Sequence, residues 1–165
     1  MNNHIVNIKL VIFDWGNTLM RDNPELQQPM YMWGKVELIP SATEALEYLS
    51  KKYNLCVATN AGVSDTQAMI KALERVDIAR YFQYFYSSID LRVSKPLPAF
   101  FEKICHEIGI PPSQTVIIGN SYDKDIVGAK QAGLHTIFFD EWKQANLNPD
   151  ADRVIHHLKE LTEIL

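Results

Sequence analysis

The chain has 165 residues, of which 47% are hydrophobic and 22% are charged, and its formal net charge is −4. This size and composition predict a single globular domain covering residues 1–165. Because a mildly acidic chain without runs of Lys and Arg offers no surface for phosphate backbones, we expect no nucleic-acid partner.

The longest apolar stretches are about half as long as a membrane-spanning helix needs to be. The first residues, MNNHIVNIK, lack the charged start, apolar middle and cleavage site of a signal peptide. We therefore expect a cytoplasmic protein without a membrane partner. Cys56 and Cys105 lie in apolar surroundings without zinc-type spacing, so we expect two buried thiols.

Apolar runs typical of β-strands alternate along the chain with segments of helical periodicity. In chain order, the pattern predicts a strand at 8–13, a helix at 41–52, a strand at 55–59, a helix at 64–75, a strand at 84–88, a helix at 97–108, a strand at 115–119, a helix at 123–132, a strand at 134–139 and a helix at 154–164. Parallel strands need crossovers of helical length. The expected fold class is therefore α/β, with a doubly wound five-stranded parallel sheet.

One long irregular stretch, residues 19–40, contains Pro24, Pro29, Gly34 and Pro40. At about 20 residues it is too short for a second domain, and loops of this length are often functional. We expect it to form a loop or flap. Tyr31, Met32 and Trp33 in this stretch either cover Asp14 or pack the loop against the sheet.

Polar residues follow four of the predicted strands. Parallel sheets bind ligands at the carboxyl ends of their strands, so these residues should share one edge. They are Asp14 after the first strand, Thr59 and Asn60 after the second, Lys95 after the third, and GNSYDKD at 119–125 after the fourth. Taken singly, several of them also suit helix caps or turns.

Taken together, these motifs resemble the haloacid dehalogenase-like (HAD) hydrolase superfamily. In that family the first strand ends in D-x-D-x-T, the second in Ser or Thr, a Lys-Pro precedes a helix, and the fourth strand ends in G-D-S-x-x-x-D. The corresponding segments here are DWGNT (14–18), Thr59, Lys95 with Pro96, and GNSYDKD (119–125). The resemblance covers almost the whole chain and implies a Rossmann-like fold.

The resemblance also implies a phosphatase-like reaction on a phosphorylated substrate. Asp14 would attack phosphorus and form an aspartyl-phosphate, and Lys95 would reach Asp14 and neutralise its charge. Thr59, Asn60 and Lys95 would bind the phosphoryl group. The implied cofactor is Mg²⁺, held by Asp14, the main-chain carbonyl of Gly16, Asn120 and Asp125.

Two residues depart from the family pattern. Gly16 stands where the family has the Asp that protonates the leaving group, a loss worth on the order of 10² to 10⁴ in rate. Asn120 replaces the first acid of the metal loop and removes one negative charge. Asp123 is either a helper at the metal or a helix cap.

About 40 residues separate the first two motifs, which leaves no room for a cap domain. Phosphonate cleavage and dehalogenation, the family's other reactions, rely on such a cap, so a phosphatase is favoured. An open site would suit a large substrate or closure by another subunit. Two hypotheses remain: a phosphatase-like hydrolase, weak because of Gly16, and a weakened relative that binds a phosphorylated ligand or a protein partner.

Overall fold

The computed structural model describes residues 5–144 and 150–165, which form one parallel sheet with helices on both faces. The strands are β1 (Leu10–Phe13), β2 (Asn54–Thr59), β3 (Tyr84–Ser87), β4 (Thr115–Gly119), β5 (His135–Phe139) and β6 (Arg153–Ile155). Their order across the sheet is β3-β2-β1-β4-β5-β6, and every pair is parallel. The expected doubly wound α/β fold is therefore present.

The helical segments connect these strands. They are η1 (Met30–Met32), α1 (Ala42–Ser50), α2 (Thr66–Arg75), η2 (Ala79–Tyr81), α3 (Ser88–Leu91), α4 (Pro98–Ile108), η3 (Pro112–Gln114), the π-helical turn η4 (Tyr122–Val127), α5 (Gly128–Gln131), η5 (Leu158–Glu160) and α6 (Leu161–Ile164). No helix of the described ranges is long and apolar enough to cross a bilayer.

The sheet has six strands where the sequence pattern predicts five. Residues 153–155 form β6 beside β5, so the helix expected over 154–164 was wrong over residues 154–157. The Asp152 carboxylate accepts hydrogen bonds from the Thr136 N–H at 2.8 Å and from Lys130 at 3.0 Å, and these bonds hold the start of β6. Only η5 and α6 remain helical.

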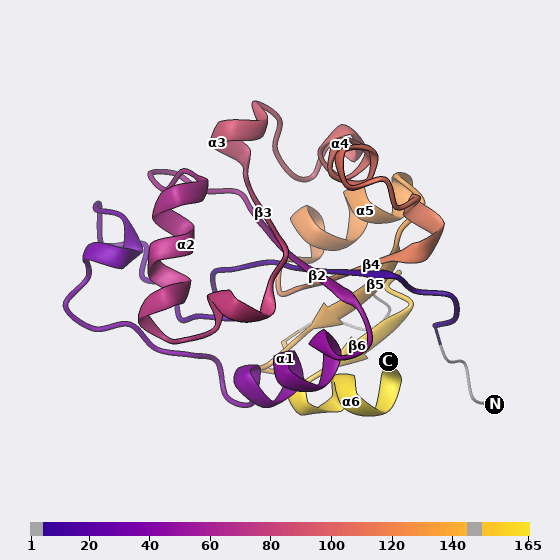
Figure 1. The fold of residues 1–165 in the computed structure, drawn as a ribbon, viewed down its shortest axis with the longest axis horizontal. Helices are drawn as coiled ribbons and strands as arrows, with labels where there is room; N and C mark the ends of the chain where they lie inside the picture. Colours follow the sequence, from indigo (N-terminus) through magenta and orange to yellow (C-terminus); the bar gives the residue numbers. More distant parts are fainter. Residues whose placement is uncertain (1–4, 145–149) are drawn as a thin grey trace.

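Two apolar cores cover the two faces of the sheet. Side chains of α1, α2 and α6 pack on one face, together with Phe13 of β1 and Trp33 of the 19–40 loop. Side chains of α3, α4 and α5 pack on the other face against Ile12. Figure 1 shows α1 and α6 on the opposite side of the sheet from α4 and α5. Both cysteines are buried and free, as expected.

The strand order reverses between β1 and β4, because β1 continues to β2 on one side while β4 leads to β5 on the other. This reversal leaves a crevice at the carboxyl ends of the two central strands. Asp14 follows β1 and Asn120 follows β4, so the topology places both at this crevice.

Candidate active site

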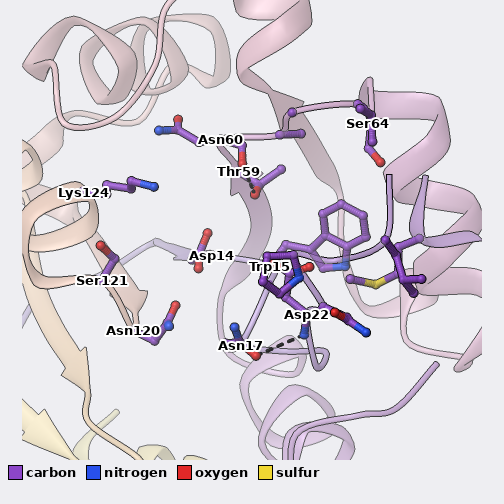
Figure 2. A pocket seen from close by; sticks show the side chains of 18 of the residues that line it. Asp14, Trp15, Asn17, Asp22, Thr59, Asn60, Ser64, Asn120, Ser121 and Lys124 are labelled. Carbon is purple, nitrogen blue, oxygen red and sulfur yellow. Dashed lines mark hydrogen bonds between the residues drawn. The ribbon is translucent and has the colours of Figure 1, made fainter. Parts of the chain in front are cut away.

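A cavity of about 490 Å³ opens at the carboxyl ends of the central strands. All seven residues singled out from the sequence line it, namely Asp14, Gly16, Thr59, Asn60, Lys95, Asn120 and Asp125. Figure 2 shows Thr59 and Asn60 on one side of Asp14, and Asn120 and Ser121 on the other. Four separate chain segments therefore meet around one carboxylate.

Asp14 is fixed by the sheet that precedes it. Its N–H donates to the Ile118 carbonyl at 2.9 Å, which extends the pairing of β1 with β4 by one residue. Its carboxylate is 8% exposed and accepts hydrogen bonds from Lys95 Nζ at 2.8 Å and from the Thr18 hydroxyl at 3.2 Å. A buried carboxylate at the end of a strand, with one face toward a cavity, is placed to act as a nucleophile.

Lys95 is the central cation of the site. Its buried ammonium donates to Asp14 at 2.8 Å, to Asp125 at 2.7 Å and to the Ala58 carbonyl at 3.3 Å, so all three N–H groups are used. Burial opposes its charge, but the carboxylates of Asp125 and Asp14 outweigh burial and raise the pKa of Lys95. The expected contact between Lys95 and Asp14 is present.

Asn60 holds the segment that carries Lys95. Its side-chain amide donates to the Lys95 carbonyl at 2.7 Å and accepts from the Lys95 N–H at 2.9 Å. The sequence pattern did not reveal this pairing, because the two residues are 35 positions apart and lie in different loops. Thr59 is buried next to it and lines the cavity.

Asp125 is buried beside Gly119, the last residue of β4. Its carboxylate accepts from Lys95 at 2.7 Å and from the Ser121 N–H at 2.9 Å, so both oxygens are hydrogen-bonded. Burial raises the pKa of Asp125 to about 6, and the charge of Asp14 acts in the same direction. A Cβ at Gly119 would lie 2.3 Å from the Asp125 carboxyl carbon, so only glycine leaves room for this side chain.

Asn120 faces the oxygens that the family resemblance assigns to a metal. The atom placed as its side-chain oxygen lies 3.0 Å from Asp14 Oδ2, 3.2 Å from the Gly16 carbonyl and 3.1 Å from the Thr18 hydroxyl. With the amide turned over, its NH₂ group lies within hydrogen-bond distance of all three and shares its two N–H groups among them. The NH₂ orientation satisfies the surrounding oxygens, and a cation bound between them would require the oxygen orientation.

The oxygen orientation suits a magnesium ion. Adjacent ligands of an octahedral ion with bonds of about 2.0–2.1 Å lie about 3 Å apart, which matches the distances from the Asn120 amide atom to Asp14 Oδ2 and to the Gly16 carbonyl. The donors are one carboxylate, one carbonyl and one amide, all hard oxygen ligands. Within residues 5–144 and 150–165, no three His, Cys, Asp or Glu side chains gather around a metal position. With Asn120 in the oxygen orientation, these three groups could hold Mg²⁺ with a low ligand charge.

Asp123 lies apart from these residues. It is exposed in the π-helical turn η4 and does not line the cavity. The residue that precedes this turn, Ser121, makes no side-chain cap, and the Asp123 side chain makes none either among the described contacts. The position supports neither role considered for Asp123.

The 19–40 loop forms part of the cavity wall. Trp33 and Met30 line the cavity, whereas Tyr31 packs under Lys71 of α2, with the ammonium 5.0 Å from the ring centre. Arg75 of α2 donates to the main-chain carbonyls of Tyr31 and Trp33 and so ties the loop to the helix. The loop also brings Asp22 to the cavity. From the sequence, Asp22 is the nearest loop acid that could supply the proton missing at position 16, although it is not among the predicted site residues.

Comparisons with known proteins bear on the family of this chain. The family model for haloacid dehalogenase-like hydrolases matches residues 25–133, more than half of the chain, although the match begins after Asp14. A glyceraldehyde 3-phosphate phosphatase from Pyrococcus furiosus is 30% identical over 132 residues, which are 77% of this chain and 54% of that protein. A ribulose-1,5-bisphosphate 5-phosphatase from Halopiger xanaduensis is 27% identical over 141 residues, 79% of this chain and 58% of that protein.

The chain spans about half the length of these curated relatives. Among solved structures, an uncharacterised protein from Listeria monocytogenes serotype 4b matches with a TM-score of 0.84 at 26% identity, covering 94% of this chain and 96% of that one. The putative HAD-hydrolase YfnB from Bacillus subtilis, solved bound to magnesium, matches with a TM-score of 0.79 at 18% identity, covering 96% of this chain and 99% of that one. The latter likeness concerns the fold alone.

Proposed function

The chain belongs to the haloacid dehalogenase-like hydrolase family, and we propose that it is a magnesium-dependent phosphatase-like hydrolase that acts through an aspartyl-phosphate on Asp14. One observation carries this proposal. The Asp14 carboxylate lies at the strand reversal with Lys95 at 2.8 Å on one oxygen and the Asn120 amide at 3.0 Å from the other. We further propose that residues 1–165 act as a single domain, without a cap between β1 and β2.

In the first step, a carboxylate oxygen of Asp14 attacks phosphorus and the bond from phosphorus to the leaving oxygen breaks. Two negative groups must approach each other, so positive charge has to be in place beforehand. Lys95 supplies it, because its ammonium is buried, charged and already in contact with Asp14. Thr59, Asn60 and Lys95 would hold the phosphoryl group, with the Asn60 side chain acting through the position of Lys95.

Asp14, the Gly16 carbonyl and Asn120 would hold Mg²⁺, and the bound ion would supply further positive charge for the phosphoryl oxygens. We propose that Asp125 also contributes to this metal site, through its negative charge. Because both of its oxygens are hydrogen-bonded, its negative charge would favour the cation without displacing Lys95 or Ser121.

The substrate in this proposal is a phosphoric monoester. The names of the relatives support this class, since those proteins are phosphatases of small phosphorylated compounds. The part of the substrate beyond the phosphate would face Trp15, Met30 and Trp33, which line the cavity on the side of the 19–40 loop. A segment of only about 40 residues between the first two motifs leaves the mouth accessible to large substrates.

A second candidate function is binding of a phosphorylated ligand or protein partner with little turnover. Gly16 and Asn120 favour it, because each removes a carboxylate that the family's phosphatases use. Under this alternative, Asp14 and Lys95 recognise the phosphate, but no residue protonates the leaving oxygen and the ester bond is not cleaved.

Turnover of an aryl phosphate and of a sugar phosphate, with and without Mg²⁺, tests the proposal. Wild type should show magnesium-dependent turnover, and Asp14→Asn should lower it by at least about 10³-fold, because the amide cannot attack phosphorus. Asp123→Asn is the matched control, since Asp123 does not line the cavity. Magnesium-dependent binding of inorganic phosphate without turnover would favour the second candidate, and equal turnover by Asp14→Asn would refute the first.

A further inference from the structure

We infer that Asp22 takes the place of the proton-transferring acid that is missing at position 16. This inference rests on the proposed function, since it assigns a residue to the same phosphoryl-transfer site. It names Asp22 as a catalytic residue that protonates the leaving group and then activates water.

The geometry around Gly16 carries the inference. A Cβ built on Gly16 would lie 3.3 Å from Asp22 Cβ, 3.4 Å from its carboxyl carbon and 3.4 Å from Oδ2. The side chain of Asp22 therefore borders the space into which a side chain at position 16 would extend. Gly16 has no positive φ, so its backbone conformation is open to other residue types. The glycine at position 16 is therefore better explained by the neighbouring Asp22 side chain than by backbone strain.

The loop holds Asp22 at this position by several hydrogen bonds. The Asp22 N–H donates to the Asn17 side chain at 3.1 Å, the dashed line in Figure 2. Asn17 in turn donates from its N–H to the Met20 carbonyl at 2.6 Å, and Met20 bridges to Gly16 and Leu38. The next residue back, Arg21, pairs with Glu141 through two bonds of 2.6 and 2.7 Å. Residues 17–22 thus fold back so that position 22 lies beside position 16.

Asp22 is also the carboxylate that remains available in the cavity. The acidic side chains that line it, within the described parts of the chain, are Asp14, Asp22 and Asp125. Asp14 and Asp125 are both bound to Lys95. The side chain of Asp22 is exposed, and none of the described residues forms an ion pair or hydrogen bond with its carboxylate.

The two proton transfers balance. As an Asp14 oxygen bonds to phosphorus and the bond to the leaving oxygen breaks, the protonated Asp22 gives its proton to that oxygen, which leaves as an alcohol. The Asp22 carboxylate then takes a proton from water, whose oxygen attacks the phosphorus of the aspartyl-phosphate. The bond from phosphorus to Asp14 breaks, and inorganic phosphate, the Asp14 carboxylate and protonated Asp22 result.

Substitution of Asp22 tests the inference through its dependence on the leaving group. Asp22→Asn should lower turnover of a sugar phosphate by about 10² to 10⁴-fold, because a sugar alkoxide leaves poorly without a proton. With an aryl phosphate, formation of the phosphoenzyme should change little and its hydrolysis should slow. Intact-mass measurements should then show phosphorylated Asp22→Asn and little phosphorylated wild type. Glu25→Gln is the control, because Glu25 is an exposed acid of the same loop that does not line the cavity.

A rescue variant separates chemistry from loop structure. In an Asp22→Asn background, Gly16→Asp should restore most of the sugar-phosphate turnover, since the new carboxylate would enter the space that Asp22 borders. Gly16→Asp alone should gain little, because two carboxylates would crowd each other. Equal loss on both substrates without phosphoenzyme accumulation or rescue would mean a structural role and would overturn the inference.

The failure of the proposed function has a different outcome. If neither wild type nor Asp22→Asn becomes phosphorylated, and Asp14→Asn turns over substrate as fast as both, then Asp14 is not the nucleophile and the proposed function is refuted. If wild type is phosphorylated on Asp14 and Asp22→Asn has the same turnover as wild type with every leaving group, the proposed function stands and only the role of Asp22 is refuted.

Discussion

At the residue scale, the Lys95 ammonium allows two buried carboxylates, Asp14 and Asp125, to lie close together. Its ammonium is 2.8 Å from Asp14 and 2.7 Å from Asp125, with all three side chains nearly inaccessible to solvent. Removing one partner of a buried ion pair leaves an uncompensated charge, which is costly. The same cation therefore serves stability and, in our proposal, phosphoryl transfer.

We predict that Lys95→Met lowers the free energy of unfolding by about 3–5 kcal/mol, the usual range for an orphaned buried charge. Urea denaturation monitored by circular dichroism measures the change. Adding Asp125→Asn should recover part of the lost stability without recovering activity, because one orphaned charge is removed while the cation stays absent. Full stability in Lys95→Met would contradict this account of the site.

Much of the candidate site is predictable at the residue scale, and the limit of prediction is clear. Asp14 and Asn120 directly follow strands and Thr59 is the last residue of β2, so their meeting at one edge follows from the parallel sheet. Asp22 lies in the irregular 19–40 loop, whose path depends on the bridges of Met20 and the hydrogen bonds of Asn17. No spacing rule places residue 22 beside residue 16, so the sequence offers Asp22 only as a nearby acid.

At the element scale, the short strand β6 depends on a single side chain beside it. Asp152 accepts hydrogen bonds from the Thr136 N–H, the Thr136 hydroxyl and Lys130. Burial opposes its ionisation, but the bonds from Lys130 and Thr136 outweigh burial and lower the pKa of Asp152. The charge of one carboxylate thus joins α5, β5 and β6.

We predict that Asp152→Asn lowers the free energy of unfolding by about 1–2 kcal/mol near neutral pH, since hydrogen bonds to a charged group are lost at a partly exposed site. The folded-state pKa lies below the unfolded value of about 3.9, so this contribution is present above pH 4 and disappears as the pH falls below it. Wild type and variant should therefore converge in stability as the pH falls through the lowered folded-state pKa of Asp152. A difference that stays constant from neutral pH to the lowest pH at which both proteins remain folded would argue against an electrostatic role.

The expected helix over 154–164 shows why local patterns failed in this part of the chain. Residues 154–164 contain enough spaced apolar side chains to read as one amphipathic helix. Two contacts make residues 153–155 a strand instead: Val154 of β6 pairs with Phe138 of β5, and Asp152 is hydrogen-bonded to Thr136. Both are contacts with residues about 16 positions away, which a local periodicity does not contain.

At the scale of the whole molecule, binding at the crevice should be visible as a change in overall stability. A ligand that binds only the folded state stabilises it by about 2.7 kcal/mol at 100 times its Kd. We predict that Mg²⁺ with inorganic phosphate raises the Tm of wild type and not that of Asp14→Asn. Differential scanning fluorimetry checks this prediction, and equal shifts in the two proteins would place the binding site elsewhere.

The fold as a whole was the most predictable level. Five strands and four of the five helices follow from alternating periodicity, because each crossover in a parallel sheet needs a helix and each buried strand an apolar run. The order of the strands carries the functional information, since the reversal between β1 and β4 creates the crevice beside Asp14.

The pairing of β1 with β4 also decides when the site can exist. The two strands are neighbours in space, yet the residues that pair, Leu10 with Thr115, are separated by about a hundred positions in the chain. Contacts of such long separation form slowly, and ribosomes deliver the N-terminal strands first. A nascent chain that has released only β1, α1 and β2 holds Asp14 and Thr59 but neither Lys95 nor Asn120. In our proposal, the catalytic site therefore cannot assemble before β4 has emerged.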